Sequence, residues 1–215
     1  FFPRGGHLVE TFNHSIFSRI LTRFALKKSS KILCQGEAIK NICTNSLNFS
    51  KKNTPIVQNW TASNDLIEIG DKKNLKDDYS LNFLFVGWLD FEKGLKEILQ
   101  SFRKISLLYP VNLNLIGKGN AWDFANDFIE ENNIKNVNLH GWLKKEKVKK
   151  FYEKSDVLLL PSWLEGFPNV IVEAMSSKVF VISSNVGNIS DIIKNGETGF
   201  LVKKKDAEDL FSKMK

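Results

Sequence analysis

The sequence predicts an α/β protein whose mostly parallel sheet is doubly wound by helices. Short apolar runs with strand character alternate along the chain with amphipathic stretches of helical period, and this alternation is typical of βαβ units. The composition agrees, because 42% hydrophobic and 26% charged residues are ordinary values for a globular chain of 215 residues. The clearest unit is residues 156–161, an apolar run that ends at a proline and precedes a loop and a helix.

The predicted elements follow in chain order. An amphipathic helix is expected over residues 16–28, with Ile16, Ile20, Leu21 and Phe24 on one face. Strands are predicted at residues 31–34, 55–58, 81–86, 111–116, 136–140, 157–160, 179–183 and 200–202. Helices are predicted between them at residues 37–46, 92–108, 122–132, 145–154, 169–177 and 207–214. The polar stretch 59–79, with mixed charges, is interpreted as a linker.

The loop and helix after residue 161 have the residue types of an anion site. Pro168 suits a first helical position, where no amide donor is needed. A helix N-terminus in the crevice at the strand ends favours an anion such as phosphate. Glu173 lies one turn after Asn169 on the same face, where a carboxylate can accept hydrogen bonds from sugar hydroxyls. Taken alone, Glu165 and Glu173 fit solvated positions on an ordinary amphipathic helix better than a binding site.

Further segments change that balance. Residues 156–184, with Glu165 and Glu173 eight positions apart, resemble the signature segment of retaining glycosyltransferases of family 4, the glycosyl transferases group 1 with the GT-B fold. Other strand-loop segments match the same family in its order, from about residue 31 to the end of the chain, at residues 83–94, 113–119, 137–143, 186–193 and 195–202. Each is weak alone, and together they are specific.

The resemblance implies a fragment of a two-domain enzyme. Residues 1–58 would be the end of the N-terminal, acceptor-side domain, residues 59–79 the linker, and residues 80–215 the nucleotide-sugar donor domain, truncated at its C-terminal end. The implied enzyme is a hexosyltransferase that moves a sugar with retention from a UDP- or GDP-linked donor to a glycan or lipid-linked acceptor, in bacterial capsule or lipopolysaccharide synthesis. The fragment alone is expected to be inactive. Two alternatives stay open: a non-catalytic nucleotide-sugar-binding protein, and a sugar-nucleotide epimerase, which would need acid–base residues that the sequence does not offer.

The resemblance also assigns roles to residues. Glu165 is the predicted catalytic residue near the donor sugar, and Glu173 is expected to bind the ribose hydroxyls. Lys93 would meet the diphosphate, and Trp142 would either stack on the base or simply pack. The full set expected to bind the donor is Gly87, Lys93, Gly94, Gly117, Lys118, Gly141, Trp142, Leu143, Gly166, Phe167, Asn169, Val170 and Glu173. No Asp-x-Asp pair or His/Cys cluster suits a metal, so we expect no metal and no other cofactor.

Some residues depart from the family pattern. Trp88 stands where an arginine usually follows the glycine, which removes one cation from the expected diphosphate clamp, although Lys118 could substitute for it. Lys178 and Asn188 replace glycines, and of these two asparagine tolerates a left-handed backbone better.

The chain carries a net charge of +7, with lysines clustered within residues 144–150 and 203–205. Such clusters can hold a protein near anionic lipid, and they are equally compatible with solvated faces. Nucleic-acid binding fits less well, because the aromatic residues fall inside apolar runs rather than among the lysines. Cys34 and Cys43 are interpreted as small buried hydrophobes. No apolar run is long enough to cross a bilayer, and we expect a cytoplasmic location, with peripheral contact at the inner face of the membrane.

Overall fold

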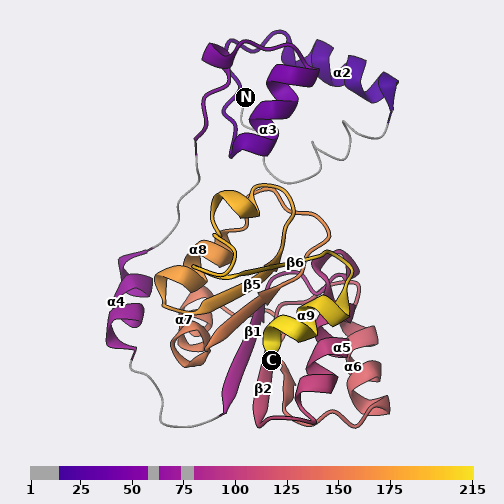
Figure 1. Ribbon diagram of the computed structural model, residues 1–215, viewed down its shortest axis with the longest axis vertical. Coiled ribbons are helices and arrows are strands. Elements are labelled where there is room, and N and C mark those ends of the chain that lie inside the picture. Colours follow the sequence, from indigo (N-terminus) through magenta and orange to yellow (C-terminus); the bar gives the residue numbers. More distant parts are fainter. Residues whose placement is uncertain (1–14, 58–62, 74–79) are drawn as a thin grey trace. The chain divides into compact units, whose positions relative to one another are not determined.

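The computed structural model describes residues 15–57, 63–73 and 80–215 of the chain (Figure 1). The chain forms two compact units. The large unit comprises residues 61–163, 169–185 and 193–215, and the small unit comprises residues 1–60 with the two short segments 164–168 and 186–192.

The large unit is built on one parallel sheet, as predicted. Its strands run β3-β2-β1-β4-β5-β6 across the sheet, and every pair of neighbours is parallel. The strands are β1 (Leu81–Val86), β2 (Val111–Ile116), β3 (Val137–Leu139), β4 (Val157–Leu160), β5 (Phe180–Ser184) and β6 (Phe200–Val202). The order reverses between β1 and β4, so the carboxyl ends of these two strands form the switch point where ligands bind in open α/β sheets.

Helices cover both faces of this sheet. Helices α5 (Leu95–Ile105), α6 (Trp122–Glu131) and α9 (Ala207–Met214) lie together on one face (Figure 1). On the other face, α4 (Asn64–Lys72) packs against α7 (Lys145–Lys154) and α8 (Asn169–Ser176). The prediction of a doubly wound sheet is therefore confirmed, and α4 lies inside the stretch interpreted as a linker.

Burial follows from the residue pattern. Phe83, Leu84 and Phe85 are fully buried in β1, as expected of a strand covered on both faces. Helix α5 buries the residues of its apolar stripe, which recur at helical spacing: Leu95, Ile98, Leu99, Phe102 and Ile105.

The small unit contains α2 (Ile16–Leu26), α3 (Glu37–Asn41), a π-helical turn at Ile42–Ser46 and a 3-10 turn at Lys51–Asn53. Its core consists of Leu26, Ile32, Cys34, Ile39, Cys43 and Leu47. Both cysteines are buried and free, which confirms their interpretation as small hydrophobes. The apolar face of α2 is exposed, with Phe24 at 72% and Leu21 at 52%.

Two predicted strands and two predicted helices need correction. Of the strands predicted at residues 31–34 and 55–58, the described part of this region contains only one isolated bridge, Cys34 to Ile56, and residue 58 lies outside the described residues. Ile32 and Cys34 are apolar because they are buried in the small core, whereas Ile56 is half-buried and Val57 is exposed. The helix predicted at 92–108 begins only at Leu95, because Gly94 takes a left-handed conformation with φ 76° that separates the 3-10 turn Phe91–Lys93 from α5. The helix predicted at 37–46 becomes π-helical at Ile42. Other boundaries shift by one to three residues.

Candidate functional site

Three neighbouring strands of the large unit end in glycines that pack directly on one another. Gly87 follows β1, Gly117 follows β2, and Gly141 lies just beyond β3. The amide of Gly117 donates to the Gly141 carbonyl at 2.9 Å, and the amide of Gly87 donates to the Ile116 carbonyl at 3.0 Å. A Cβ on Gly117 would lie 1.8 Å from the Gly87 carbonyl oxygen, so no side chain fits there. We call these three residues the glycine platform.

Two exposed tryptophans stand beside the glycine platform. The rings of Trp88 and Trp142 meet edge to face with centroids 4.7 Å apart, and they are 57% and 55% exposed. Trp142 therefore does not pack in the core, and neither does Trp88. The next residue, Leu143, is half-buried. Lys118 is exposed and its ammonium lies 5.2 Å from the ring centroid of Trp122.

The Lys93–Gly94 turn lies at the switch point. Gly94 is buried, and a Cβ on it would lie 2.3 Å from the carbonyl oxygen of Pro161, just after β4. The turn after β1 is thus packed against the end of β4, and half-buried Lys93 precedes the first residues of α5. The Asp90 carboxylate accepts a hydrogen bond from the Asn120 amide at 2.8 Å, which ties the loop after β1 to the loop after β2.

Glu173 lies on α8 and is only half-buried. Its Oε2 accepts a hydrogen bond of 2.9 Å from the Tyr152 hydroxyl of α7. Asn169 and Val170, which were also predicted to contact the nucleotide-sugar donor, form the start of α8. Pro168 directly precedes the helix rather than beginning it. The contact with Tyr152 was not predicted, because a tyrosine inside a lysine-rich helix gives no sign of the distant carboxylate that it meets.

The loop that carries Glu165 belongs to the small unit. Glu165 is half-buried, and Gly166 and Phe167 are buried. The Gly166 carbonyl accepts from the Asn188 amide at 3.3 Å and from the Asn188 side-chain amide at 3.1 Å. Gly187 has φ 60°, and a Cβ on it would lie 2.1 Å from the Glu165 carbonyl oxygen. The backbone of the predicted catalytic residue is therefore held by tight packing against the 187–188 turn.

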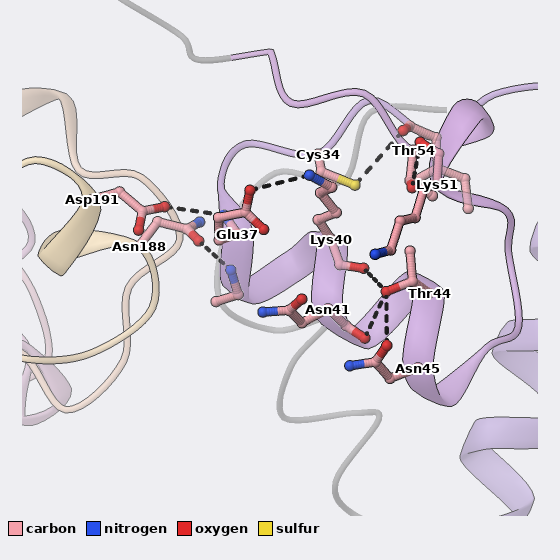
Figure 2. Close-up of polar contacts among 12 residues, drawn as sticks. Cys34, Glu37, Lys40, Asn41, Thr44, Asn45, Lys51, Thr54, Asn188 and Asp191 are labelled. Carbon is pink, nitrogen blue, oxygen red and sulfur yellow. Dashed lines mark hydrogen bonds and ion pairs between the residues drawn. The ribbon is translucent and has the colours of Figure 1, made fainter.

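The same turn caps α3 (Figure 2). The Asn188 side-chain oxygen accepts from the Ala38 amide at 3.2 Å, and the Asp191 carboxylate accepts from the Glu37 amide at 3.0 Å. These are amides of the first turn of α3, which have no partner inside the helix. Asn188 itself has φ −104°, so the expected left-handed conformation falls on Gly187 instead.

His140 makes the contacts of a structural residue. Its Nε2 lies 2.8 Å from the Asn114 side-chain oxygen, and its ring contacts Phe151 at an interplanar angle of 57°, with centroids 4.6 Å apart. Partial burial lowers the pKa of His140, because it disfavours the charged imidazolium.

Two lysines of the basic clusters make contacts within the protein. Lys149 forms an ion pair with Asp65, and the Lys205 ammonium lies 4.1 Å from the ring centroid of Trp163. In the described part of the chain, no group of three or more His, Cys, Asp or Glu residues is arranged to hold a metal ion. None of the described helices is both long and apolar enough to span a bilayer.

The sheet order and the glycine-ended strands define the class of the large unit. It is a Rossmann-like domain of the kind that binds ligands at the carboxyl ends of its strands, and its fold is that of the GT-B glycosyltransferases. The chain belongs to the family of glycosyl transferases group 1, whose sequence profile matches residues 67–215.

Individual relatives agree with this assignment. The chain is 31% identical to MJ1178, an uncharacterized glycosyltransferase of Methanocaldococcus jannaschii, over 94% of this chain and 53% of the relative. It is 32% identical to CapM, a capsular polysaccharide biosynthesis glycosyltransferase of Staphylococcus aureus, over 86% of this chain and 48% of the relative. The structure of Anabaena HepE in complex with UDP matches with a TM-score of 0.74 at 16% identity, over 93% of this chain and 57% of that chain. The chain thus spans about half the length of these proteins.

Proposed function

We propose that this chain provides the donor-binding half of a retaining hexosyltransferase. The enzyme would transfer a sugar from a UDP- or GDP-linked donor to a glycan or lipid-linked acceptor in capsule or lipopolysaccharide synthesis. Two relatives support the proposal: CapM is a capsular polysaccharide glycosyltransferase, and HepE has been solved with UDP.

The observation that carries the proposal is the switch point between β1 and β4. There a glycine turn bearing Lys93 packs against the end of β4, and the glycine platform beside it places no side chain at three neighbouring strand ends. Backbone amides and one ammonium are the groups that bind a diphosphate. In this assignment Lys93 and Gly94 meet the diphosphate, Glu173 accepts from the ribose, and Trp142 stacks on the base.

The remaining predicted residues complete the arrangement. Glu165 would be the catalytic residue near the donor sugar, with Gly166, Phe167, Asn169 and Val170 contacting sugar and phosphate. Gly87, Gly117 and Gly141 would let the backbone approach the ligand, Lys118 would supply the phosphate-binding cation that Trp88 removes, and Leu143 would border the base.

Calorimetric titration of the 215-residue chain with UDP and GDP tests the donor site. We expect Glu173→Ala and Lys93→Ala each to weaken the preferred nucleotide about tenfold to hundredfold, since hydrogen bonds to charged groups contribute about 1.5–3 kcal/mol. Glu130→Ala and Lys96→Ala, which remove exposed charges from α6 and α5, serve as matched controls. Unchanged affinity in both site variants would refute the assignment.

Turnover separates transfer from mere binding. We expect no sugar transfer by these residues alone, because closure of two domains around the donor is needed in GT-B enzymes. A longer protein that contains this chain should transfer sugar from the donor that binds. Binding without transfer by that longer protein would instead support a non-catalytic nucleotide-sugar-binding protein, an alternative that Trp88 favours because it removes a phosphate-binding cation. Conversion of the donor to its epimer would instead support a sugar-nucleotide epimerase, the other alternative that the sequence leaves open.

We further propose catalysis without a bound metal, in the cytoplasm and in peripheral contact with anionic lipid. Excess chelator should leave nucleotide affinity and transfer unchanged. The lipid contact would rest on the lysines of α7, because a basic residue near an anionic surface contributes about 1 kcal/mol. Co-sedimentation with vesicles that contain anionic lipid, compared with neutral vesicles, tests it; equal binding to both would refute it.

A further inference from the structure

A buried phenol holds the carboxylate that we assign to the ribose. Tyr152 is 1% exposed, and it is the buried residue of α7, a helix otherwise rich in lysine. Its hydroxyl donates to Glu173 Oε2 at 2.9 Å. A buried hydroxyl without a partner is costly, and a hydrogen bond to an ionised acceptor is stronger than one between neutral groups. The contact therefore fixes the Glu173 side chain against α7.

The donor in this pair is itself held in place. The carbonyl of Tyr152 accepts from the Lys73 ammonium at 3.4 Å, and the Ser155 carbonyl accepts from the same ammonium. The C-terminal turn of α7 is thus attached to the residue that follows α4. Burial, and then the negative charge of Glu173, raise the pKa of the Tyr152 hydroxyl well above its usual value. The hydroxyl stays protonated and remains a donor throughout the physiological range.

The geometry leaves most of the carboxylate available. An ionised carboxylate offers about four acceptor positions on two oxygens, and the phenol occupies one of them. Glu173 is half-buried, so the other positions can reach a ligand. A free glutamate would lose rotamer entropy on binding, whereas an anchored one has already lost part of it.

We propose that Tyr152 is a positioning residue: it anchors one oxygen of Glu173 so that the carboxylate is pre-organised to accept hydrogen bonds from the two hydroxyls of a ribose. This inference rests on the proposed function, because it assigns the diol to a nucleotide. Tyr152 lies on α7, outside the signature segment of residues 156–184 that contains Glu173, so the inference adds a residue to the proposed site.

The test compares ribose and deoxyribose ligands. Calorimetry gives the Kd of UDP and 2′-deoxy-UDP for the unmodified chain and for Tyr152→Phe, or of the guanosine pair if GDP binds more tightly. We expect the unmodified chain to prefer the ribonucleotide about tenfold, as loss of a hydrogen bond to a charged group predicts. Tyr152→Phe removes only the hydroxyl oxygen, and we expect the preference to fall below about threefold, with the deoxynucleotide affinity nearly unchanged. Tyr109→Phe, at an exposed tyrosine after α5, should keep the full preference.

A second pair of variants separates positioning from a merely structural role. If Tyr152 acts through Glu173, Tyr152→Phe should change the ribose preference in the native background but not in Glu173→Gln. A role in packing alone would weaken both nucleotides equally in both backgrounds, and that result would overturn the inference. The double variant contains no unpaired charge, and its thermal melt shows whether the fold tolerates the loss of the Tyr152 hydroxyl.

The outcomes also distinguish this inference from the proposed function. If neither UDP nor GDP binds the unmodified chain, the nucleotide site itself is refuted. If a nucleotide binds and Tyr152→Phe retains the full ribose preference, the site stands and the role of Tyr152 is refuted.

Discussion

Replacing Trp88 by arginine tests how this chain meets a diphosphate without the arginine that the family pattern implies. Trp88 is 57% exposed and touches Trp142 edge to face, so the new side chain would not be buried. Loss of the aromatic pair should cost about 0.5–1.5 kcal/mol. For a chain of this size that lowers the melting temperature by roughly 1–6 °C.

The same change should tighten nucleoside-diphosphate binding. An exposed guanidinium beside a phosphate contributes up to about 1 kcal/mol, or about fivefold in Kd. The gain should shrink as salt is added, because the screening length falls from about 10 Å at 0.1 M ionic strength to about 3 Å at 1 M. Trp88→Phe keeps an aromatic ring without adding charge and is the matched control.

A thermal melt and titrations at two salt concentrations decide the outcome. A large loss of stability is expected only if Trp88 packs behind its loop, because the arginine would then bury an unpaired charge and destabilise the fold by about 3–5 kcal/mol. A melting temperature lowered by more than 10 °C, with no tighter binding, would refute the conclusion that Trp88 faces the ligand side of the strand ends.

Two further predictions concern the backbone and pH. Gly187→Ala should lower the free energy of unfolding by at least about 2 kcal/mol more than Gly196→Ala. Both glycines have positive φ, which costs an alanine about 1–2 kcal/mol at either position. Only at 187 would the new Cβ meet a carbonyl oxygen, at 2.1 Å, whereas nothing lies within 4 Å of it at 196. Equal losses in urea denaturation would show that the contact with Glu165 is unimportant. Because the pKa of Tyr152 is raised in the folded protein from an ordinary value of 10.0, the folded state binds more protons above pH 10, and stability should fall as pH rises through that range. Tyr152→Phe should show a shallower fall, measured as unfolding free energy between pH 9 and 11, and identical slopes would contradict the assigned shift.

Most of the large sheet could be predicted from sequence because its strands are short runs rich in apolar residues, which are buried most fully in β4 and β5. Such runs differ from helices in length and period, so 81–86, 111–116, 157–160 and 200–202 were predicted with their observed bounds. The small unit is different. Ile32 and Cys34 are apolar because they fill a core with Cys43 and Leu47. A short buried segment that is not paired in a sheet has the same sequence pattern as a strand.

The site residues show the same division between local and long-range information. Glycines at the strand ends were predicted from the family resemblance, and the structure adds a local reason for one of them, because Gly117 approaches Gly87 too closely for a side chain. The partners of Glu173 and of the Glu165 loop could not be predicted, since Tyr152 and Asn188 lie 21 and 22 positions from the groups that they contact. Such hydrogen bonds depend on tertiary placement, which local periodicity does not encode.

The residues that depart from the family pattern have specific structural contacts in place of those they remove. Trp88 lacks the positive charge of the arginine in the family pattern, and its ring contacts that of Trp142. Lys178 takes a left-handed conformation with φ 51°, which is unfavourable for a lysine, and its ammonium lies 3.4 Å from the Asp71 carboxylate. Asn188 leaves the left-handed position to Gly187 and bonds both the Gly166 carbonyl and the Ala38 amide. A glycine could make neither of these side-chain contacts, so Asn188 links the Glu165 loop to the first turn of α3 through hydrogen bonds that need its side-chain amide.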